Sequence, residues 1–291
     1  MGHDYEYIST LGCEYQEQNI NRISIGFQSI RNDILKAYDR THKEDEAFQA
    51  FQVARKAGFK NINIDLIYSF PGQELNDWME DLEKVCAINP DHISCYELSY
   101  EPGTALTKQK DKGRIKPTSI DLATSFFLNT RKKLKEHGFE SYEVSAFAKN
   151  KKYCEHNLKY WTHSPYIGIG AGASSWLNPQ IIKNINAPHK YIENILKHNK
   201  AIEEVQHCSK ETIFFDRLMM GLRLEQWGVN YLEIQNAPNY MLKKINESIE
   251  KGFLEISYKN NNKFLRASKK GFLQIDSILQ AIMPETSTHS V

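Results

Sequence analysis

Residues 21–100 alternate between short β-prone runs and amphipathic helical patterns, and this alternation constrains the fold more than any other feature. The runs at 21–29, 61–70 and 92–100 are rich in β-branched and aromatic residues, and a Pro-Gly pair closes the second. The segments between them carry apolar residues near helical spacing. Strands and helices in this order, with short connections, are typical of parallel strands joined by right-handed crossovers. The sequence therefore predicts an α/β fold built on a parallel sheet.

Further elements follow the same reasoning. Two helical patterns lie within 31–59, where Gly58 is the expected stop, and a third covers 74–88. A helix is expected across 118–137, and another strand near 140–147.

The pattern changes near residue 208, where helices and a hairpin replace the alternation of strands with helices. Helix, helix and hairpin in succession are typical of a small winged-helix-like module. We therefore predict two domains, at residues 1–207 and 208–291. The C-terminal elements expected are helices at 211–224 and 240–254, two strands within 255–268 joined by an Asn-rich turn, and a last helix at 269–283.

Composition excludes several classes of protein. The 37 basic and 36 acidic residues leave a net charge of +1, so no overall field favours nucleic acid or an acidic membrane surface. No apolar run approaches the roughly 20 residues of a membrane span. The first residues are polar and lack the apolar stretch of a secretory signal. We expect a cytoplasmic protein without a nucleic-acid partner.

The cysteines are too widely spaced for a metal-binding loop. None forms a CxxC or CxxxC pair, the spacings by which a short loop brings thiolates to one metal or cluster. We expect Cys86 and Cys95 to be packed in the core as small apolar side chains. The five cysteines are Cys13, Cys86, Cys95, Cys154 and Cys208.

Three polar residues fall at or near the carboxyl ends of the first two strands. Gln28 ends the first strand, Arg40 lies between two helical patterns, and Asp65 lies late in the second strand. Ligands of parallel α/β folds bind at this end of the sheet. An amide, a guanidinium and a carboxylate there would suit ribose hydroxyls and a carboxylate group. The alternative is that each makes only a local hydrogen bond or salt bridge.

A second group of residues lies at His156-Asn157-Leu158-Lys159-Tyr160-Trp161. Neutral imidazole is a good iron ligand, and aromatic neighbours suit a flat apolar macrocycle. The alternative is a core histidine held by Asn157 among packing aromatics. The glycine-rich run 168–175 permits close backbone approach to an anion, or forms a close-packed turn. His42 and His92 are expected to make structural hydrogen bonds.

Six segments, in order and at matching spacing, resemble the oxygen-independent coproporphyrinogen III oxidase-like branch of the radical SAM proteins. Within it they resemble HemW, the heme chaperone subgroup, because HNxxYW is associated with heme in that subgroup. The resemblance covers about residues 18–285. The segments are NRISIGFQS (21–29), RTH (40–42), NINIDLIYSFPGQ (61–73), HISCYELSYEPGTAL (92–106), CEHNLKYW (154–161) and GIGAGASSW (168–176).

This resemblance implies a fold, cofactors and partners. The fold is an incomplete (β/α)6 barrel, followed by the helical module at 208–291. The family's cofactors are S-adenosylmethionine, a 4Fe-4S cluster and heme, and its protein partners are heme acceptors. Gln28, Arg40 and Asp65 match the residues that contact S-adenosylmethionine. The heme-associated residues are matched by His156, as an iron ligand, and by Asn157, Tyr160 and Trp161.

The sequence departs from the family in lacking the CxxxCxxC loop that follows the first barrel strand. We therefore expect an N-terminally truncated form without the three cluster ligands, and no catalytic residue is assigned. Strand 21–29 would then be an unpaired edge that favours self-association. Two alternatives stay open: a fragment of the porphyrinogen oxidase itself, or a heme-binding module without a cluster. The sequence also leaves open whether this chain is an enzyme.

Overall fold

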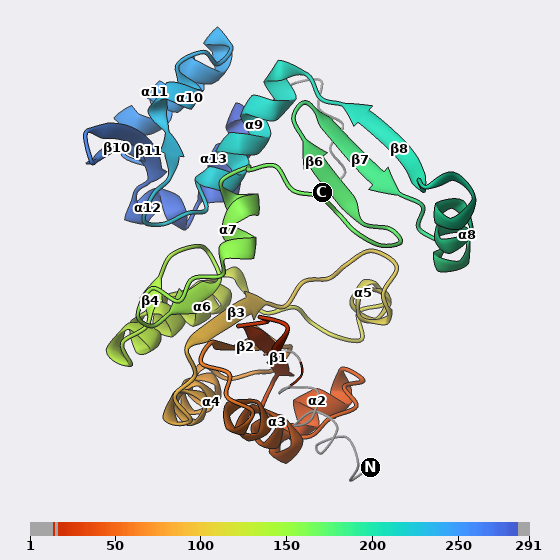
Figure 1. Ribbon diagram of the computed structural model, residues 1–291. Coiled ribbons are helices and arrows are strands. Elements are labelled where there is room, and N and C mark those ends of the chain that lie inside the picture. Colours follow the sequence, from red (N-terminus) through yellow and green to blue (C-terminus); the bar gives the residue numbers. More distant parts are fainter. Residues whose placement is uncertain (1–13, 15–16, 285–291) are drawn as a thin grey trace. The chain divides into compact units, whose positions relative to one another are not determined.

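A computed structural model describes residue 14 and residues 17–284 of the protein (Figure 1). The chain forms two compact units, Met1–Tyr153 (unit 1) and Cys154–Val291 (unit 2). The domain boundary expected at residue 208 falls inside unit 2, at the start of its helical part, and stays a prediction. No helix in the described part of the chain is both long and apolar enough to cross a membrane.

Unit 1 is built on one open five-stranded sheet. Its first three strands are β1 (Ile23–Gln28), β2 (Ile62–Tyr68) and β3 (His92–Glu97), and they pair in parallel, which confirms the predicted parallel arrangement. The sheet order is β1-β2-β3-β5-β4, so the described strands form an open sheet and no closed barrel. Among the described residues, no strand pairs with the outer side of β1.

The strand expected near 140–147 is instead two short strands, β4 (Glu140–Ser141) and β5 (Ala146–Ala148), and β5 runs antiparallel to β3. The turn between them has a local cause. The buried carboxylate of Glu143 accepts a hydrogen bond from the backbone N–H of Ser145 at 3.1 Å, and this bond bends the chain back on itself.

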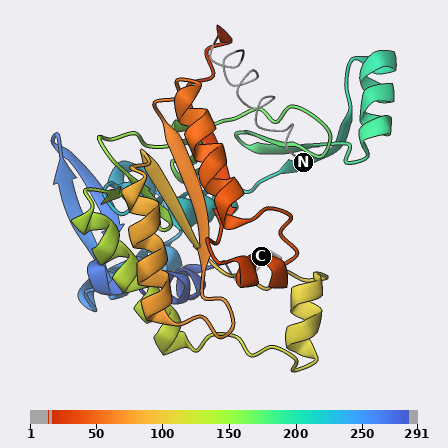
Figure 2. The same ribbon diagram turned by 90° about the horizontal axis from the view of Figure 1, so that it is seen from below.

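Three helices cover one face of this sheet: α3 (Glu44–Lys56), α4 (Leu75–Ala87) and α6 (Ile120–Glu136) (Figure 2). Alternate strand residues face them and form the core of unit 1. The remaining helices of unit 1 are α2 (Asn32–Ala37) and α5 (Ala105–Asp111). The largest buried core side chains are Phe27, Phe51, Phe59, Ile62, Ile64, Leu66, Trp78, Leu82, Phe126 and Phe139.

The opposite face of the same strands is polar. Ser24 of β1 is paired in register with Asn63 of β2, and Asn63 with His92 of β3. Two residues further along, Asp65 is paired with Ser94. Because side chains alternate across a strand, these residues share one face, and the apolar residues between them turn to the helices.

Unit 2 begins with α7 (Glu155–Trp161) and a three-stranded antiparallel sheet that the sequence did not predict. The strands are β6 (Ser174–Leu177), β7 (Gln180–Asn184) and β8 (Ile202–His207), and α8 (Pro188–His198) connects the last two. Every residue of β8 is exposed. This strand therefore lacks the buried alternation that identifies a strand from sequence.

The rest of unit 2 is a helical module with a β-hairpin and its own core. The paired strands β10 and β11 confirm the hairpin expected within 255–268. The last helix expected is broken in two, near Gly271, whose backbone lies too close to the Phe253 carbonyl to leave room for a Cβ. The elements are α9 (Lys210–Gly221), β9 (Val229–Asn230), α10 (Tyr231–Ile234), α11 (Asn239–Glu250), β10 (Leu254–Lys259), β11 (Asn262–Ala267), α12 (Lys269–Phe272) and α13 (Ile275–Ile282).

Replacing Thr130 with valine tests the packing of α4 on α6. The indole Nε1 of Trp78 donates to Thr130 Oγ1 at 2.7 Å, and both side chains are buried. Thr130→Val keeps the shape but leaves this buried donor without an acceptor, which costs about 1–3 kcal/mol. We expect the free energy of unfolding in urea to fall by that amount. As a control, Ser125→Ala on the exposed side of α6 should change it by less than about 0.5 kcal/mol, and equal effects would contradict the assignment.

Candidate functional site

A cleft of about 470 Å³ lies at the carboxyl ends of the three parallel strands of unit 1. Two of the three residues expected there, Gln28 and Arg40, line it. Asp65 is not among its lining residues; it lies in the middle of β2, on the polar face of the sheet. The remaining lining residues are Ser29, Ile34, Leu35, Tyr38, Ile67, Phe70, Tyr96, Glu97, Leu98, Ser99, Glu101, Thr104 and Leu106.

Gln28 is held in an unusual backbone conformation at the end of β1. Its φ is 62°, in the left-handed region that non-glycine residues rarely adopt. A Cβ on Gly26 would lie 2.5 Å from Gln28 Nε2, so the amide folds back over a space that only glycine leaves free. His42 holds the neighbouring carbonyl, because its Nε2 lies 2.9 Å from the Phe27 oxygen. The expected structural hydrogen bond of His42 is confirmed.

Aromatic rings form one wall of the cleft. The rings of Tyr38 and Phe70 are 4.6 Å apart and tilted by 54°. Burial, with a smaller contribution from Tyr100, raises the pKa of Tyr38 to about 12, so its hydroxyl stays protonated at neutral pH. Arg40 is exposed, and its backbone N–H donates to the Leu35 carbonyl at 2.9 Å. An apolar wall with one cation at the rim suits a ligand with a flat ring and an anionic group.

The carboxylate of Asp65 belongs to a hydrogen-bonded chain across the polar face of the sheet. Ser24 Oγ donates to its Oδ2 at 2.5 Å, and Asn63 Nδ2 donates to its Oδ1 at 2.8 Å. Asn63 Nδ2 also lies 2.6 Å from Ser24 Oγ. This carboxylate is therefore oriented by its neighbours before any ligand approaches.

His92 extends the chain to the far side of the sheet. Its Nδ1 lies 2.6 Å from Asn63 Oδ1, and its Nε2 lies 2.9 Å from the hydroxyl of Tyr142. Because the Asn63 amide nitrogen faces the Asp65 carboxylate, its oxygen faces His92, so Nδ1 carries the imidazole proton and Nε2 accepts from Tyr142. Burial lowers the pKa of His92 to about 3, which keeps the ring neutral. The structural hydrogen bonds expected of His92 are confirmed.

In unit 2, α7 carries all four residues that the sequence associates with heme. His156 is exposed, and its Nε2 lies 3.0 Å from the hydroxyl of Tyr160, one helical turn further on. Asn157 and Trp161 are half-buried and lie on a different face of the helix. The histidine is therefore a surface side chain, and the alternative of a core histidine is wrong.

The glycine-rich run 168–175 packs closely on itself. A Cβ on Gly168 would lie 2.3 Å from the Ser174 carbonyl oxygen, and one on Gly172 would lie 2.6 Å from Asn186 Oδ1. The backbone N–H of Gly168 donates to Ser175 Oγ at 2.9 Å. These contacts favour the close-packed turn over an anion-binding loop.

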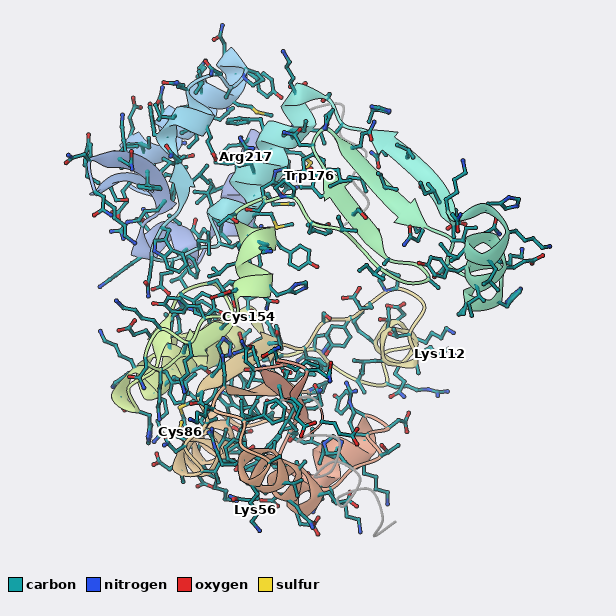
Figure 3. The ribbon with its side chains drawn as sticks, in the orientation of Figure 1. Lys56, Cys86, Lys112, Cys154, Trp176 and Arg217 are labelled. Atoms are coloured by element: carbon teal, nitrogen blue, oxygen red, sulfur yellow. The ribbon has the colours of Figure 1, made fainter. Side chains whose placement is uncertain are left out.

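The described cysteines are dispersed. Cys86 on α4, which Figure 3 labels, and Cys95 on β3 are both buried in the core of unit 1, as predicted. Burial raises the pKa of the Cys86 thiol to about 12 and that of Cys95 well above its usual value, so neither is a ready thiolate. Cys13 lies outside the described residues. Within the described part of the chain, no three His, Cys, Asp or Glu residues are grouped to hold a metal.

Comparisons with known proteins agree with this architecture. A model of the radical SAM superfamily matches residues 12–85. Coproporphyrinogen III oxidase (HemN) from Escherichia coli, described as a radical SAM enzyme, superposes with a TM-score of 0.74 over 94% of this chain and 66% of its own. Its sequence identity of 18% means that this likeness shows the fold alone. The fold is therefore a mixed α/β fold that resembles that of HemN.

Proteins similar in sequence identify the family more closely. The heme chaperone HemW of Buchnera aphidicola subsp. Acyrthosiphon pisum is 32% identical over 276 residues, 93% of this chain and 70% of that protein. HemW of Buchnera aphidicola subsp. Schizaphis graminum is 33% identical over 282 residues, 92% of this chain and 70% of that protein. The chain belongs to the HemW family.

Titration of His92 should be visible in the pH dependence of stability. The imidazole has a pKa of about 3 in the folded protein, while an unfolded histidine titrates near 6.5. Between these values the unfolded chain binds more protons, so lowering the pH through 6.5 destabilises the folded state by up to about 1.4 kcal/mol per pH unit. His92→Gln removes this titration. We expect wild type to be more stable than the variant at pH 7, and the gap to shrink by about 2 kcal/mol at pH 5 in urea unfolding. A gap that is constant with pH would contradict a neutral, buried His92.

Proposed function

We propose that this protein binds heme and passes it to acceptor proteins, with α7 as the heme contact and the cleft of unit 1 as a site for S-adenosylmethionine. The observation that carries the proposal is α7 itself. In a chain of the HemW family, this one helix presents the imidazole of His156 at the surface, with an aromatic partner one turn away. An exposed imidazole on a helix is open to a large planar ligand, as a core histidine would not be.

The residues of α7 fit heme. When bound, heme offers an axial iron position that a neutral imidazole fills. The Tyr160 hydroxyl bonds His156 Nε2, and it would have to turn away for that nitrogen to become the ligand. The ring of Tyr166 lies 4.6 Å from that of Tyr160 and adds apolar surface beside it. Asn157 and Trp161 lie about 100° and 140° around the helix axis from His156, so they would reach the periphery of the macrocycle and not its face.

The cleft of unit 1 fits S-adenosylmethionine in size and chemistry. Its volume is within the range of small-molecule sites. The Gln28 amide would hold the ribose hydroxyls, and the Arg40 guanidinium would hold the carboxylate of the methionine part. The Asp65 carboxylate, already fixed by Ser24 and Asn63, would offer a further acceptor. In this proposal the open sheet corresponds to the C-terminal strands of a (β/α)6 barrel, and the helical module of unit 2 to the winged-helix-like part.

The described residues do not fit a 4Fe-4S cluster, so no chemical step is assigned through one. That the chain lacks all three cluster ligands stays a prediction, as do its cytoplasmic location and self-association at the β1 edge.

Substituting His156 tests the heme site. In a titration of the full chain with ferric heme, we expect His156→Ala to weaken binding at least about tenfold and to shift the Soret band, because an axial ligand is lost. His198→Ala serves as the matched control, since His198 is an exposed histidine on α8 of the same unit. Identical titrations for wild type and His156→Ala would overturn the proposed heme contact.

The contact between the Gln28 amide and Gly26 leads to a second prediction, which concerns ligand binding in the cleft of unit 1. Gly26→Ala places a methyl group 2.5 Å from Gln28 Nε2 and so displaces the end of this flexible side chain; it should weaken binding of S-adenosylmethionine, but by no more than Gln28→Ala does. If both act through the same amide, the double variant should bind no more weakly than Gln28→Ala alone, with a coupling energy of about 0.5–3 kcal/mol. Equilibrium dialysis with labelled S-adenosylmethionine measures this. Additive losses would mean that Gly26 does not serve to seat Gln28.

A further inference from the structure

Unit 2 contains a group of buried nitrogen atoms without hydrogen-bond partners. They are Trp161 Nε1, His163 Nδ1 and Arg217 Nε, and none has a partner among the described residues. Leaving a buried donor unpaired costs about 1–3 kcal/mol, so such atoms are rare and each calls for a physical explanation. Two of them, Trp161 Nε1 and Arg217 Nε, can only donate, and they indicate that an acceptor belongs there.

Two of these side chains come from different helices and line one cavity. Trp161 ends α7, and Arg217 lies in the middle of α9; both line one cavity of about 190 Å³. Figure 3 shows Arg217 on α9 and Trp176 on β6. The His163 ring packs against Trp176, with ring centroids 4.6 Å apart. Burial, together with the charge of Arg217, lowers the pKa of His163 to about 4, so its imidazole is neutral and has one N–H to donate.

The residues that line the cavity limit the chemical class of the ligand that supplies the acceptor. A guanidinium at its edge selects an anion, and the planar fork of N–H groups matches a carboxylate. Apolar side chains form the other walls and suit a short alkyl arm. The volume is too small for a macrocycle but large enough for a carboxylate on such an arm. The apolar lining residues are Leu224, Trp227, Val229 and Phe264.

Glu233 is the one carboxylate among the residues that line this cavity, and it does not satisfy Arg217. Its Oε2 lies 3.5 Å from Arg217 Nε, too far for a normal hydrogen bond, and its side chain is 43% exposed. An exposed ion pair of this kind is weak because water screens it. A ligand carboxylate entering the cavity would compete with Glu233 at the rim.

We propose that this cavity is a carboxylate-binding subsite that takes the propionate arm of a bound heme through Arg217 and the Trp161 indole. Identifying the carrier as heme rests on the proposed function; the carboxylate site does not. Helix α7 links the two contacts, since His156 and Trp161 are five residues apart, or about 7.5 Å along the helix axis. One element thus presents both an iron ligand and a donor for the periphery of the ring.

The first experiment measures carboxylate binding to the subsite in the absence of heme. Sodium propionate is added to the full chain, and the Trp161 indole N–H is followed by NMR, with its signal assigned from Trp161→Phe. We expect a saturable shift that sodium chloride at equal ionic strength does not produce, and that Arg217→Gln abolishes. Arg223→Gln is the control, since Arg223 lies just beyond α9 and pairs with Asp276 at 2.7 Å. Absence of a saturable shift in wild type would overturn the subsite.

Glu233→Gln gives an independent test with a change in the opposite direction. Removing the competing anion should tighten propionate binding, while keeping the size and shape of the side chain. Weaker binding in this variant would contradict a carboxylate subsite, because a neighbouring negative charge can only oppose an anion.

The second experiment identifies the source of the carboxylate by comparing heme with heme dimethyl ester, whose arms carry no charge. We expect wild type to favour heme over the ester by roughly tenfold or more, and Arg217→Gln to lose that preference while keeping its Soret position. Equal affinities with an intact propionate response would overturn heme as the source. If wild type binds neither porphyrin, the proposed function fails, while the propionate titration still decides the subsite.

Discussion

The side-chain amide of Asn63 connects the three parallel strands of unit 1, and the arrangement of the polar face depends on it. It is 3% exposed and uses its full bonding capacity. Its nitrogen donates to Ser24 and Asp65, and its oxygen accepts from His92 Nδ1 and from Ser94 Oγ at 3.2 Å. A slip of one residue in any strand would replace one of these partners by an apolar side chain. The amide therefore fixes strand register together with the orientation of the Asp65 carboxylate.

This polar face is stable because the other face of the same strands is apolar and covered by helices. The strands thus serve two purposes at once: alternate residues build the core, and the residues between them build an ordered polar surface. At the carboxyl ends of the strands the alternation stops, and the backbone turns at Gln28 through a left-handed conformation. The cleft forms where regular strand geometry ends, which is where side chains from separate strands converge.

The sequence predicted those parts of the structure that depend on local pattern. The three parallel strands, the buried cysteines and the hairpin near the C-terminus follow from apolar runs and turn residues. The seating of Gln28 over Gly26 was not predictable, because it depends on a backbone angle and a contact across two residues. Asp65 was expected at the strand end but lies mid-strand, in a network whose other members come from β1 and β3. The sheet β6–β8 was missed because β8 is exposed along its whole length.

The two groups of polar side chains differ in one physical respect that separates positioning from binding. In the chain from Tyr142 to Asp65, donors and acceptors are matched, so the network needs no ligand to be stable and its role is to hold one carboxylate in place. Around Arg217 the buried nitrogens are all potential donors, and the described residues supply them no hydrogen-bond acceptor. Buried donors without acceptors lower the stability of the folded protein, and a bound ligand that supplies the acceptors removes this cost. Unmatched donors therefore mark a ligand subsite that the sequence motif on α7 could not reveal, because the motif contains Trp161 but neither His163 nor Arg217.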